Sequence, residues 1–262
     1  MNRSLSGSQV PPTRPKAIHI QKPNPSASFA KFTRRTLLLT VFTALFVGLY
    51  RWADTIKSRW YIFDPTDLHQ IVLEAIDRHP NSTSGVIHRI AQQLESRPAL
   101  KNHINLNPFP QPHLTSSPYP SEWVFNNAGG AMGSMYILHA SITEYLILFG
   151  TPIGTEGHTG RHTADDYFHI LQGRQLAFRP GQLEAETYTK GSVHYLKRGE
   201  VKQYKIPDEG CWALELAQGW IPLMMPFGVA DGMFSTVDFI TLYHTIRITA
   251  RETIKNLISG KI

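Results

Sequence analysis

Acidic residues set among apolar ones are the feature of this sequence best suited to chemistry. Glu215 lies in the run CWALELAQGW (211–220), Glu144 lies in a second apolar run, and Asp165-Asp166 follow the loop GHTGRHTA (157–164). Apolar surroundings disfavour a charged carboxylate and raise its pKa, so that such an acid can still carry a proton near pH 7. Two acids in unequal environments allow one to donate a proton while the other accepts one.

Each of these acids also has a purely structural interpretation. Apolar and other residues alternate around Glu215, so its side chain can point into solvent from a strand whose other face is buried. Asp165-Asp166 suit a turn or a helix cap, and both roles stay open for them. Asp231 and Asp238 bracket the start of the last expected helix, where capping is the favoured role.

Metal and nucleophile chemistry are poorly supported by residue spacing. His158 and His162 are four residues apart and His194 lies in a cupin-like turn, but Gly160-Arg161 interrupt the His-x-His pair of cupin metal sites. Cys211 is the single cysteine, which excludes an intrachain disulfide and a cysteine-based metal site. We therefore expect no bound metal.

Two further motifs, a hydrolase serine and a phosphate-binding loop, are incomplete in this sequence. Ser134 lacks the Gly-x-Ser-x-Gly elbow of hydrolases. The stretch GGAMG (129–133) is not followed by the Lys-Ser/Thr of a phosphate loop, and close helix packing is the favoured role for its glycines.

The amino-terminal part of the chain indicates a membrane anchor. The net charge of +6 is concentrated before Asp54, the first acidic residue, so the basic balance does not indicate a nucleic-acid partner. The uncharged run Leu37–Tyr50 is flanked by arginines, which favours an uncleaved transmembrane helix over a signal peptide or a mitochondrial presequence. The basic flank predicts a cytosolic arm and a lumenal body, in which Asn81 begins a glycosylation sequon.

In the rest of the chain, the residue pattern changes from helical spacing to the short apolar runs typical of β-strands. Helical spacing predicts two helices between Pro65 and Ala99, split at His79-Pro80-Asn81, whereas Leu100–Ser121 is rich in Pro and Asn and predicted to be irregular. The run ILHASITEYLILFG (137–150) suits a helix or a pair of buried strands equally. Beyond Thr155, short apolar runs between glycine turns predict a β-barrel or sandwich, and the segments 222–227 and 234–258 are predicted to be helical.

Several blocks in order carry a family resemblance over about residues 123–250. They are NAGG (127–130), HAS (139–141), EY (144–145), LFGT (148–151), GHTGR (157–161), GWIP (219–222) and FST-x-DF (234–239). Together they resemble the family of fungal C-8 sterol isomerases and the type-one sigma receptor. The sequence HTADDY (162–167) is similar to the isomerase branch, and Phe168 stands where the receptor branch has a ligand-binding Asp.

The resemblance implies a fold and an activity. It implies a mainly β protein with helices (α+β), in which a cupin-like β-barrel follows an amino-terminal transmembrane helix and precedes membrane-proximal amphipathic helices. It implies a homotrimer in the endoplasmic reticulum (ER) membrane that moves the sterol ring-B double bond from carbons 8 and 9 to carbons 7 and 8 in ergosterol synthesis, with no metal or redox cofactor. The expected boundaries are a disordered arm (1–33), an anchor (34–53), helices and a linker (54–121), the barrel (122–220) and the final helices (221–262).

The resemblance also assigns the site. The family's ligand-contacting glutamate maps onto Glu215, the expected proton donor. Its second carboxylate has no direct counterpart: Asp165 is the nearest acidic match, and Asp166 is the other candidate. His162 is expected to orient an acid, and Tyr145 to add a cation–π contribution. The remaining residues expected to line the sterol site are Met135, Phe149, Phe168, Ile221, Met224, Met225 and Thr245. The rival interpretations are a sigma-receptor-like ligand-binding chaperone without turnover and a metal-dependent cupin oxygenase.

Overall fold

The computed structural model describes residues 25–106 and 122–262. Most of the expected amino-terminal arm and of the expected Pro- and Asn-rich stretch therefore lies outside the described residues. The chain divides into two compact units, Met1–Asp54 and Thr55–Ile262.

The first unit contains most of helix α1 (Pro25–Ile56), which is long and apolar enough to cross a membrane. Its 32 residues at about 1.5 Å each exceed the roughly 30 Å of a bilayer's hydrocarbon core. The hydroxyls of Thr36 and Thr40 donate to the carbonyls of Phe32 and Thr36, which satisfies them within the helix. The helix begins before the expected anchor because no Gly or Pro follows Pro25 until Gly48.

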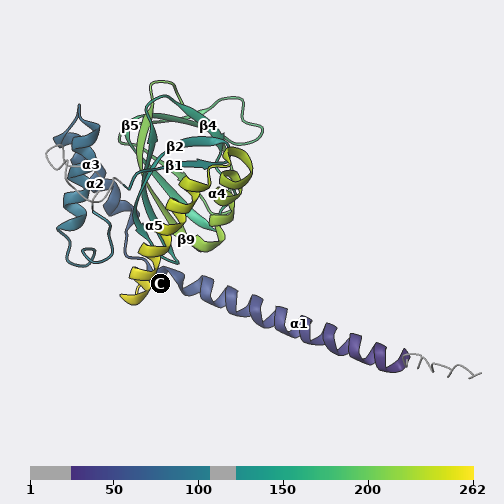
Figure 1. Ribbon diagram of the computed structural model, residues 1–262. Helices are drawn as coiled ribbons and strands as arrows, with labels where there is room; N and C mark the ends of the chain where they lie inside the picture. Colours follow the sequence, from purple (N-terminus) through teal and green to yellow (C-terminus); the bar gives the residue numbers. More distant parts are fainter. Residues whose placement is uncertain (1–24, 107–121) are drawn as a thin grey trace, which may run out of the picture. The chain divides into compact units, whose positions relative to one another are not determined.

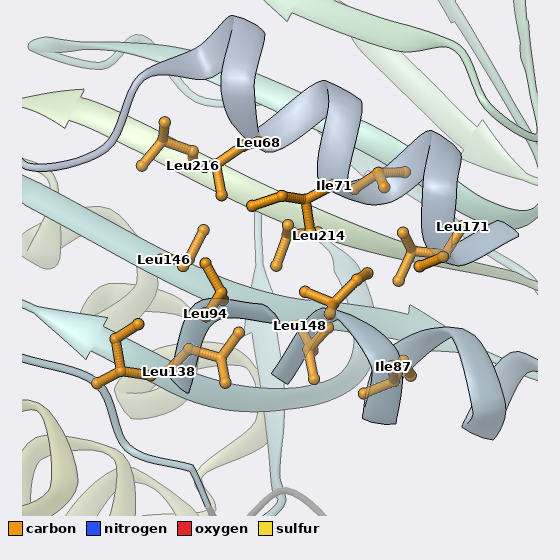
Figure 2. Packing of buried hydrophobic residues seen from close by; sticks show 14 of the residues in the cluster. Leu68, Ile71, Ile87, Leu94, Leu138, Leu146, Leu148, Leu171, Leu214 and Leu216 are labelled. Carbon is orange, nitrogen blue, oxygen red and sulfur yellow. The ribbon is translucent and has the colours of Figure 1, made fainter. Parts of the chain in front are cut away.

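Two capped helices confirm the expected helical pair of the second unit. The Asp64 carboxylate accepts from the Asp67 N–H at the start of α2 (Pro65–Arg78), and the Ser82 hydroxyl accepts from the Gly85 N–H at the start of α3 (Thr83–Glu95). Their apolar faces pack on the outer surface of the sheet, where leucines of four strands meet them (Figure 2). This packing buries the outward face of the strands that carry the site.

The strands form one antiparallel sheet that curls into a barrel, which confirms the expected mainly β fold with helices. Their order is β1-β2-β3-β9-β5-β8-β4, and β6 and β7 also pair with β5. The strands are β1 (Val124–Ala128), β2 (Ala131–Ala140), β3 (Glu144–Thr151), β4 (Thr155–His158), β5 (Ala164–Phe178), β6 (Glu186–Thr189), β7 (Val193–Leu196), β8 (Gln203–Ile206) and β9 (Cys211–Gly219).

Two turns decide questions that the sequence left open. The Ser141 hydroxyl accepts from the Glu144 N–H at 3.0 Å and fixes a tight turn, so the run 137–150 forms strands β2 and β3 rather than a helix. Gly129 and Gly130 have positive φ values of 66° and 84° and make the β1–β2 turn. Both glycines thus serve the turn, which needs the left-handed backbone that glycine adopts readily. The expected helix packing holds only for Gly129, where a Cβ would lie 2.7 Å from the ring of Phe227 in the helical segment after the barrel.

Strand β5 is long because a glycine bends it without ending it. The register with β9 shifts between Ile170 and Gln172, and Gly173 has φ +78° with the Gly210 carbonyl so close that a Cβ would lie 2.2 Å from it. The sequence suggested two short strands here. The single bent strand instead brings Asp166, near its start, and Gln175, near its end, onto the wall of the same barrel.

The chain ends in helices that cover part of the barrel (Figure 1). A short helical turn at Ile221–Leu223 leads to α4 (Met225–Asp231), a π-helical turn (Gly232–Thr236) and α5 (Phe239–Ile258). Asp238 caps α5 by accepting from the Thr241 N–H, as expected. Asp231 does not cap it: its carboxylate accepts from the Gly130 N–H at 2.9 Å and so ties α4 to the β1–β2 turn.

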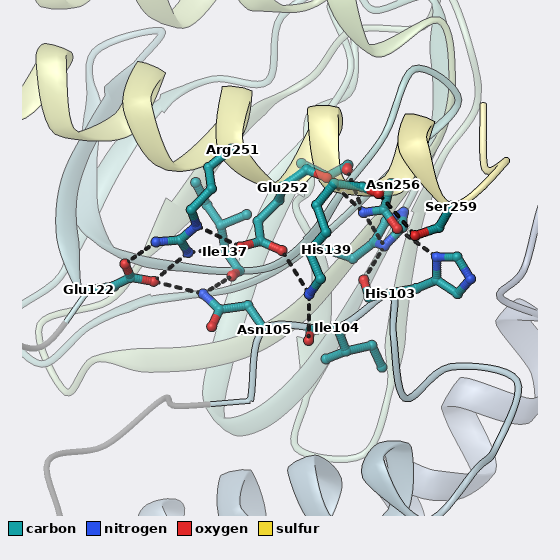
Figure 3. A network of polar contacts seen from close by, with 12 residues as sticks. His103, Ile104, Asn105, Glu122, Ile137, His139, Arg251, Glu252, Asn256 and Ser259 are labelled. Carbon is teal, nitrogen blue, oxygen red and sulfur yellow. Dashed lines mark hydrogen bonds and ion pairs between the residues drawn. The ribbon is translucent and has the colours of Figure 1, made fainter. Parts of the chain in front are cut away.

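A polar network anchors α5 to the barrel (Figure 3). Arg251 binds the Glu122 carboxylate through both terminal nitrogens, and the buried Asn256 donates to the Ala140 carbonyl at 2.9 Å. The His103 ring donates to the Asn256 side-chain oxygen at 2.6 Å. Because these bonds join α5 to β2 and to the segment after α3, the helix is held in place over the barrel interior.

Candidate active site

The barrel interior and the last two helices enclose a large apolar cavity. Its volume is about 740 Å³, within the range of small-molecule sites. Residues of β2, β3, β5 and β9 form one wall, and residues of α4 and α5 form the other. Of the residues expected to contact substrate or do chemistry, those that line it are Met135, Tyr145, Phe149, His162, Asp166, Phe168, Glu215, Met224, Met225 and Thr245.

Glu215 faces this cavity from the middle of β9. It pairs with Ile147 of β3 on one side and with Phe168 of β5 on the other. Its neighbours Leu214 and Leu216 point the other way and pack beneath α2 and α3. The strand is therefore covered on both faces, and the alternative that Glu215 points into solvent is wrong. Burial raises the pKa of Glu215 to about 7.

Asp166 is the second acid of the cavity. It pairs with Ala217, so Asp166 and Glu215 are diagonal neighbours on adjacent strands, about 7–8 Å apart at the backbone and within reach of each other's side chains. Its Oδ1 atom is buried and has no hydrogen-bond partner within residues 25–106 and 122–262. Burial, together with the charge of Glu215, holds the pKa of Asp166 well above its usual value.

Asp165 lies on the opposite face of β5 and does not line the cavity. Its Oδ1 atom accepts from the Tyr195 hydroxyl at 2.9 Å and from the Arg198 N–H at 3.0 Å. These bonds tie β5 to β7 and to the turn that follows it. Because neighbouring residues of a strand point to opposite faces, only one of the two aspartates can reach the site, and it is Asp166.

All but one of the other residues expected at the site line the cavity. Ile221 is buried against Ala164 and Ala217 and is not among the described residues that line the cavity. The rings of Phe149 and Phe168 meet edge to face at 6.2 Å inside the barrel. These two rings form part of the apolar wall near the acids.

Two polar residues of the cavity are positioned by contacts with neighbouring residues and not by contacts with Asp166 or Glu215. The Tyr145 hydroxyl lies 3.3 Å from the Thr249 hydroxyl of α5, and burial raises its pKa. The His162 ring bonds the Thr159 carbonyl at 2.6 Å and meets Phe227 edge to face, so the expected contact of His162 with an acid is absent from the described residues.

The cavity also contains polar residues that were not expected at the sterol site from the sequence, although His194 was considered there as a metal ligand. His194 and Gln175 line it, and so does Tyr204, whose pKa is raised by burial and then by the charges of Glu215 and Asp166. The sequence gives no sign that His194 and Tyr204 face inward, because β7 and β8 are only four residues long. Gln175 lies on β5 beyond the register shift between Ile170 and Gln172, so the face that it takes could not be chosen from alternation either.

Glu144, the other acid in an apolar run, has a structural role. Its side chain is fully buried and accepts from the backbone N–H groups of Ile62 and Phe63 and from the Gln218 amide. The buried Lys261 ammonium lies 2.9 Å from the same carboxylate. These bonds join the segment before α2, the barrel and the carboxyl-terminal segment.

The three histidines considered as metal ligands do not converge. The described residues include no group of three His, Cys, Asp or Glu side chains arranged to hold a metal ion. His158 accepts a bond from the Gly160 N–H through Nδ1, and His194 bonds Gln175. Their positions support hydrogen-bonding roles.

Comparison with known proteins identifies the family. The profile described as "ERG2 and Sigma1 receptor like protein" matches residues 40–261. A "C-8 sterol isomerase" of Mycosarcoma maydis is 51% identical over 94% of this chain and 99% of its own, and "C-8 sterol isomerase erg2" of Aspergillus fumigatus is 53% identical over 87% and 89%. The chicken (Gallus gallus) "Sigma non-opioid intracellular receptor 1" is 36% identical over 80% of this chain and 85% of its own.

A solved cupin-family protein from Methanocaldococcus jannaschii aligns with 36% of this chain and 85% of its own, at 14% identity and a TM-score of 0.31. The profile match begins within α1 and extends through the barrel and the final helices. The chain belongs to the family of ERG2 and sigma1 receptor like proteins.

Proposed function

We propose that this protein is a C-8 sterol isomerase, which moves a ring-B double bond from carbons 8 and 9 to carbons 7 and 8. The observation that carries the proposal is the pair Asp166 and Glu215, two buried acids in unequal environments on one wall of an apolar cavity. Relatives about half identical to this chain bear that activity as their name. The chemistry needs a proton donor and a proton acceptor on a hydrocarbon, and neither requires a cofactor.

The two acids share one proton in the active form. Two charged carboxylates this close repel each other in an apolar cavity, so the first proton is held tightly by the pair. Asp166 holds it, because the charge of Glu215 adds to the effect of burial at Asp166. This assignment reverses the expectation from sequence, in which Glu215 was the proton donor.

Asp166 donates its proton to carbon 9, and the electrons of the double bond form the new C–H bond. The tertiary carbon 8 becomes a cation beside the charged Glu215. Glu215 then removes a proton from carbon 7, and the electrons of that C–H bond form the double bond between carbons 7 and 8. The proton gained by Glu215 returns to the pair through solvent exchange, so the enzyme is restored and the sterol keeps its composition.

The cavity wall stabilises the intermediate cation. The charge of the Glu215 carboxylate acts strongly on the cation because the cavity around it is mainly apolar. The ring faces of Tyr145 and Phe168, both on the cavity wall, add a smaller cation–π contribution.

We further propose that α1 anchors the protein in the ER membrane, with the body in the lumen and the chain assembled as a homotrimer. The apolar α1 and the membrane solubility of sterols support the anchoring. Exposed apolar side chains of the last helices, including Phe234, Ile240 and Tyr243, support a membrane-proximal position for α5.

Sterol profiling tests the function. The gene is deleted in its host and restored as wild type, Asp166→Asn or Glu215→Gln. We expect 8-ene sterols to accumulate on deletion and to disappear only with the wild type. A normal profile on deletion, together with tight amine binding by the purified protein, would instead indicate a receptor without turnover.

A further inference from the structure

A polar recess lies in the cavity wall, apart from the two acids. It is formed by His194 of β7 and Gln175 of β5, whose side chains are each 3% exposed and line the cavity. His194 pairs with Phe168, and Phe168 pairs on its other side with Glu215. Directly paired residues face the same side of a sheet, so His194 and Glu215 face one cavity from strands about 10 Å apart.

The His194 ring is fixed on two sides. Its Nδ1 atom lies 2.6 Å from the Gln175 side-chain oxygen, and its face stacks on Tyr188 with ring centroids 4.3 Å apart. A side-chain amide oxygen can only accept, so Nδ1 carries the hydrogen and donates it. Burial, with the nearby charge of Lys202, lowers the pKa of His194 to about 4 and keeps the ring neutral.

These contacts leave Nε2 as a hydrogen-bond acceptor without a partner. The neutral ring with its hydrogen on Nδ1 has a lone pair on Nε2. That atom is buried and meets no hydrogen-bond donor in the part of the chain that the structure describes. A buried acceptor left unpaired is costly, and one on a side chain that lines a ligand cavity can be satisfied by a donor on the ligand.

Several other polar groups of the cavity are already engaged. The Tyr145 hydroxyl contacts Thr249, the His162 ring bonds a backbone carbonyl, and Asp238 caps α5. The unpartnered oxygen of Asp166 belongs to the acid pair. His194 therefore offers an unpaired acceptor for a neutral O–H donor, at a distance from the two acids.

We infer that His194 Nε2 accepts a hydrogen bond from the ring-A hydroxyl of the sterol, with Gln175 as the residue that positions the ring. The inference rests on the proposed function and adds the direction in which the substrate lies. A sterol carries its hydroxyl on ring A and the reacting double bond in the adjoining ring B. Ring A thus lies against β5 and β7, ring B beside Asp166 and Glu215, and the alkyl tail extends away from His194.

A comparison of two substrates in three forms of the protein tests this. The substrates are an 8-ene sterol and its 3-deoxy analogue, and the forms are wild type, His194→Phe and His194→Asn. We expect the wild type to favour the hydroxylated substrate in kcat/KM by about ten- to a hundredfold, mainly through KM. His194→Phe keeps an aromatic ring for stacking but has no acceptor, so the preference falls to about one. His194→Asn retains an acceptor and keeps part of the preference.

The outcomes separate this inference from the proposed function. If the wild type converts neither substrate, the isomerase proposal fails. If it converts both with equal kcat/KM, or if His194→Phe keeps the wild-type preference, the isomerase proposal stands and the role of His194 is overturned. If His194→Phe does not fold, Gln175→Leu replaces it: we expect a reduced preference because the ring is no longer held, and an unchanged preference contradicts the inference.

Discussion

Replacing Glu215 by Gln is expected to stabilise the protein at high pH while it abolishes turnover. The pKa of Glu215 is raised by burial from 4.5 to about 7, so the folded protein holds a proton that the unfolded chain releases above pH 4.5. Between these two values the folded state binds more protons than the unfolded state, and stability falls as pH rises. At about 1.4 kcal/mol for each pH unit, the loss amounts to about 3 kcal/mol by pH 8.

Glutamine cannot ionise, so Glu215→Gln removes this loss. The free energy of unfolding of the variant, relative to wild type, is expected to rise by about 3 kcal/mol between pH 4 and pH 8. Since the body is about 200 residues, such a change corresponds to a melting-temperature difference on the order of 10 °C. The melting temperature of detergent-solubilised protein across this pH range measures it.

The matched control is Glu184→Gln, which alters a glutamate on an exposed loop. Its stability is expected to stay within about 0.5 kcal/mol of wild type at each pH. If Glu215→Gln and wild type show parallel melting curves from pH 4 to pH 8, the carboxylate is not held out of water and the reasoning about the acid pair is refuted.

Three further predictions follow from the same geometry. Asp166→Asn is expected to lower kcat by about two to four orders of magnitude. The adjacent Asp165→Asn, on the other face of β5, is expected to change kcat by less than about fivefold. Equal losses in a turnover assay would contradict the assignment of Asp166 as the proton donor. Glu215 must be charged to accept a proton, and burial raises its pKa to about 7. We therefore expect kcat to fall about tenfold for each pH unit below about 7. A flat acidic limb in the pH–rate profile would argue against Glu215 as the proton acceptor. Lys261→Met leaves the buried Glu144 carboxylate without its cation and should lower the free energy of unfolding by about 3 kcal/mol. The exposed Lys255→Met should lower it by less than about 1 kcal/mol. Denaturant unfolding measures both variants, and similar losses would refute the structural role of Lys261.

The sequence predicted much of the fold because the local signals were strong. Helical spacing and a split at His79-Pro80-Asn81 located α2 and α3, and glycine turns marked most strands. The run 137–150 remained ambiguous because its apolar residues have no clear period: strands β2 and β3 are covered on both faces, by the helices outside and the barrel interior. Only the turn at Ser141 separates the two possibilities.

The site was partly predictable for a related reason. Glu215 stood out as a charge in an apolar strand, but the choice between Asp165 and Asp166 required the register of β5 against β9, which no local pattern contains. His194 and Gln175 depend on how β7 pairs with a bent β5, and the bend at Gly173 is a tertiary contact with Gly210. The polar recess could therefore be found only from the structure.

In the proposed mechanism, Asp166 and Glu215 share one proton and pass it through the sterol. Conversion of an 8-ene sterol by the purified protein in D₂O, read by NMR of the product, is the decisive test of this claim. We predict one deuterium at carbon 9 and the loss of one hydrogen from carbon 7 with wild type, and product formation about two to four orders of magnitude slower with Asp166→Asn. A 7-ene product that contains no deuterium, or deuterated product from Asp166→Asn at the wild-type rate, would contradict the claim.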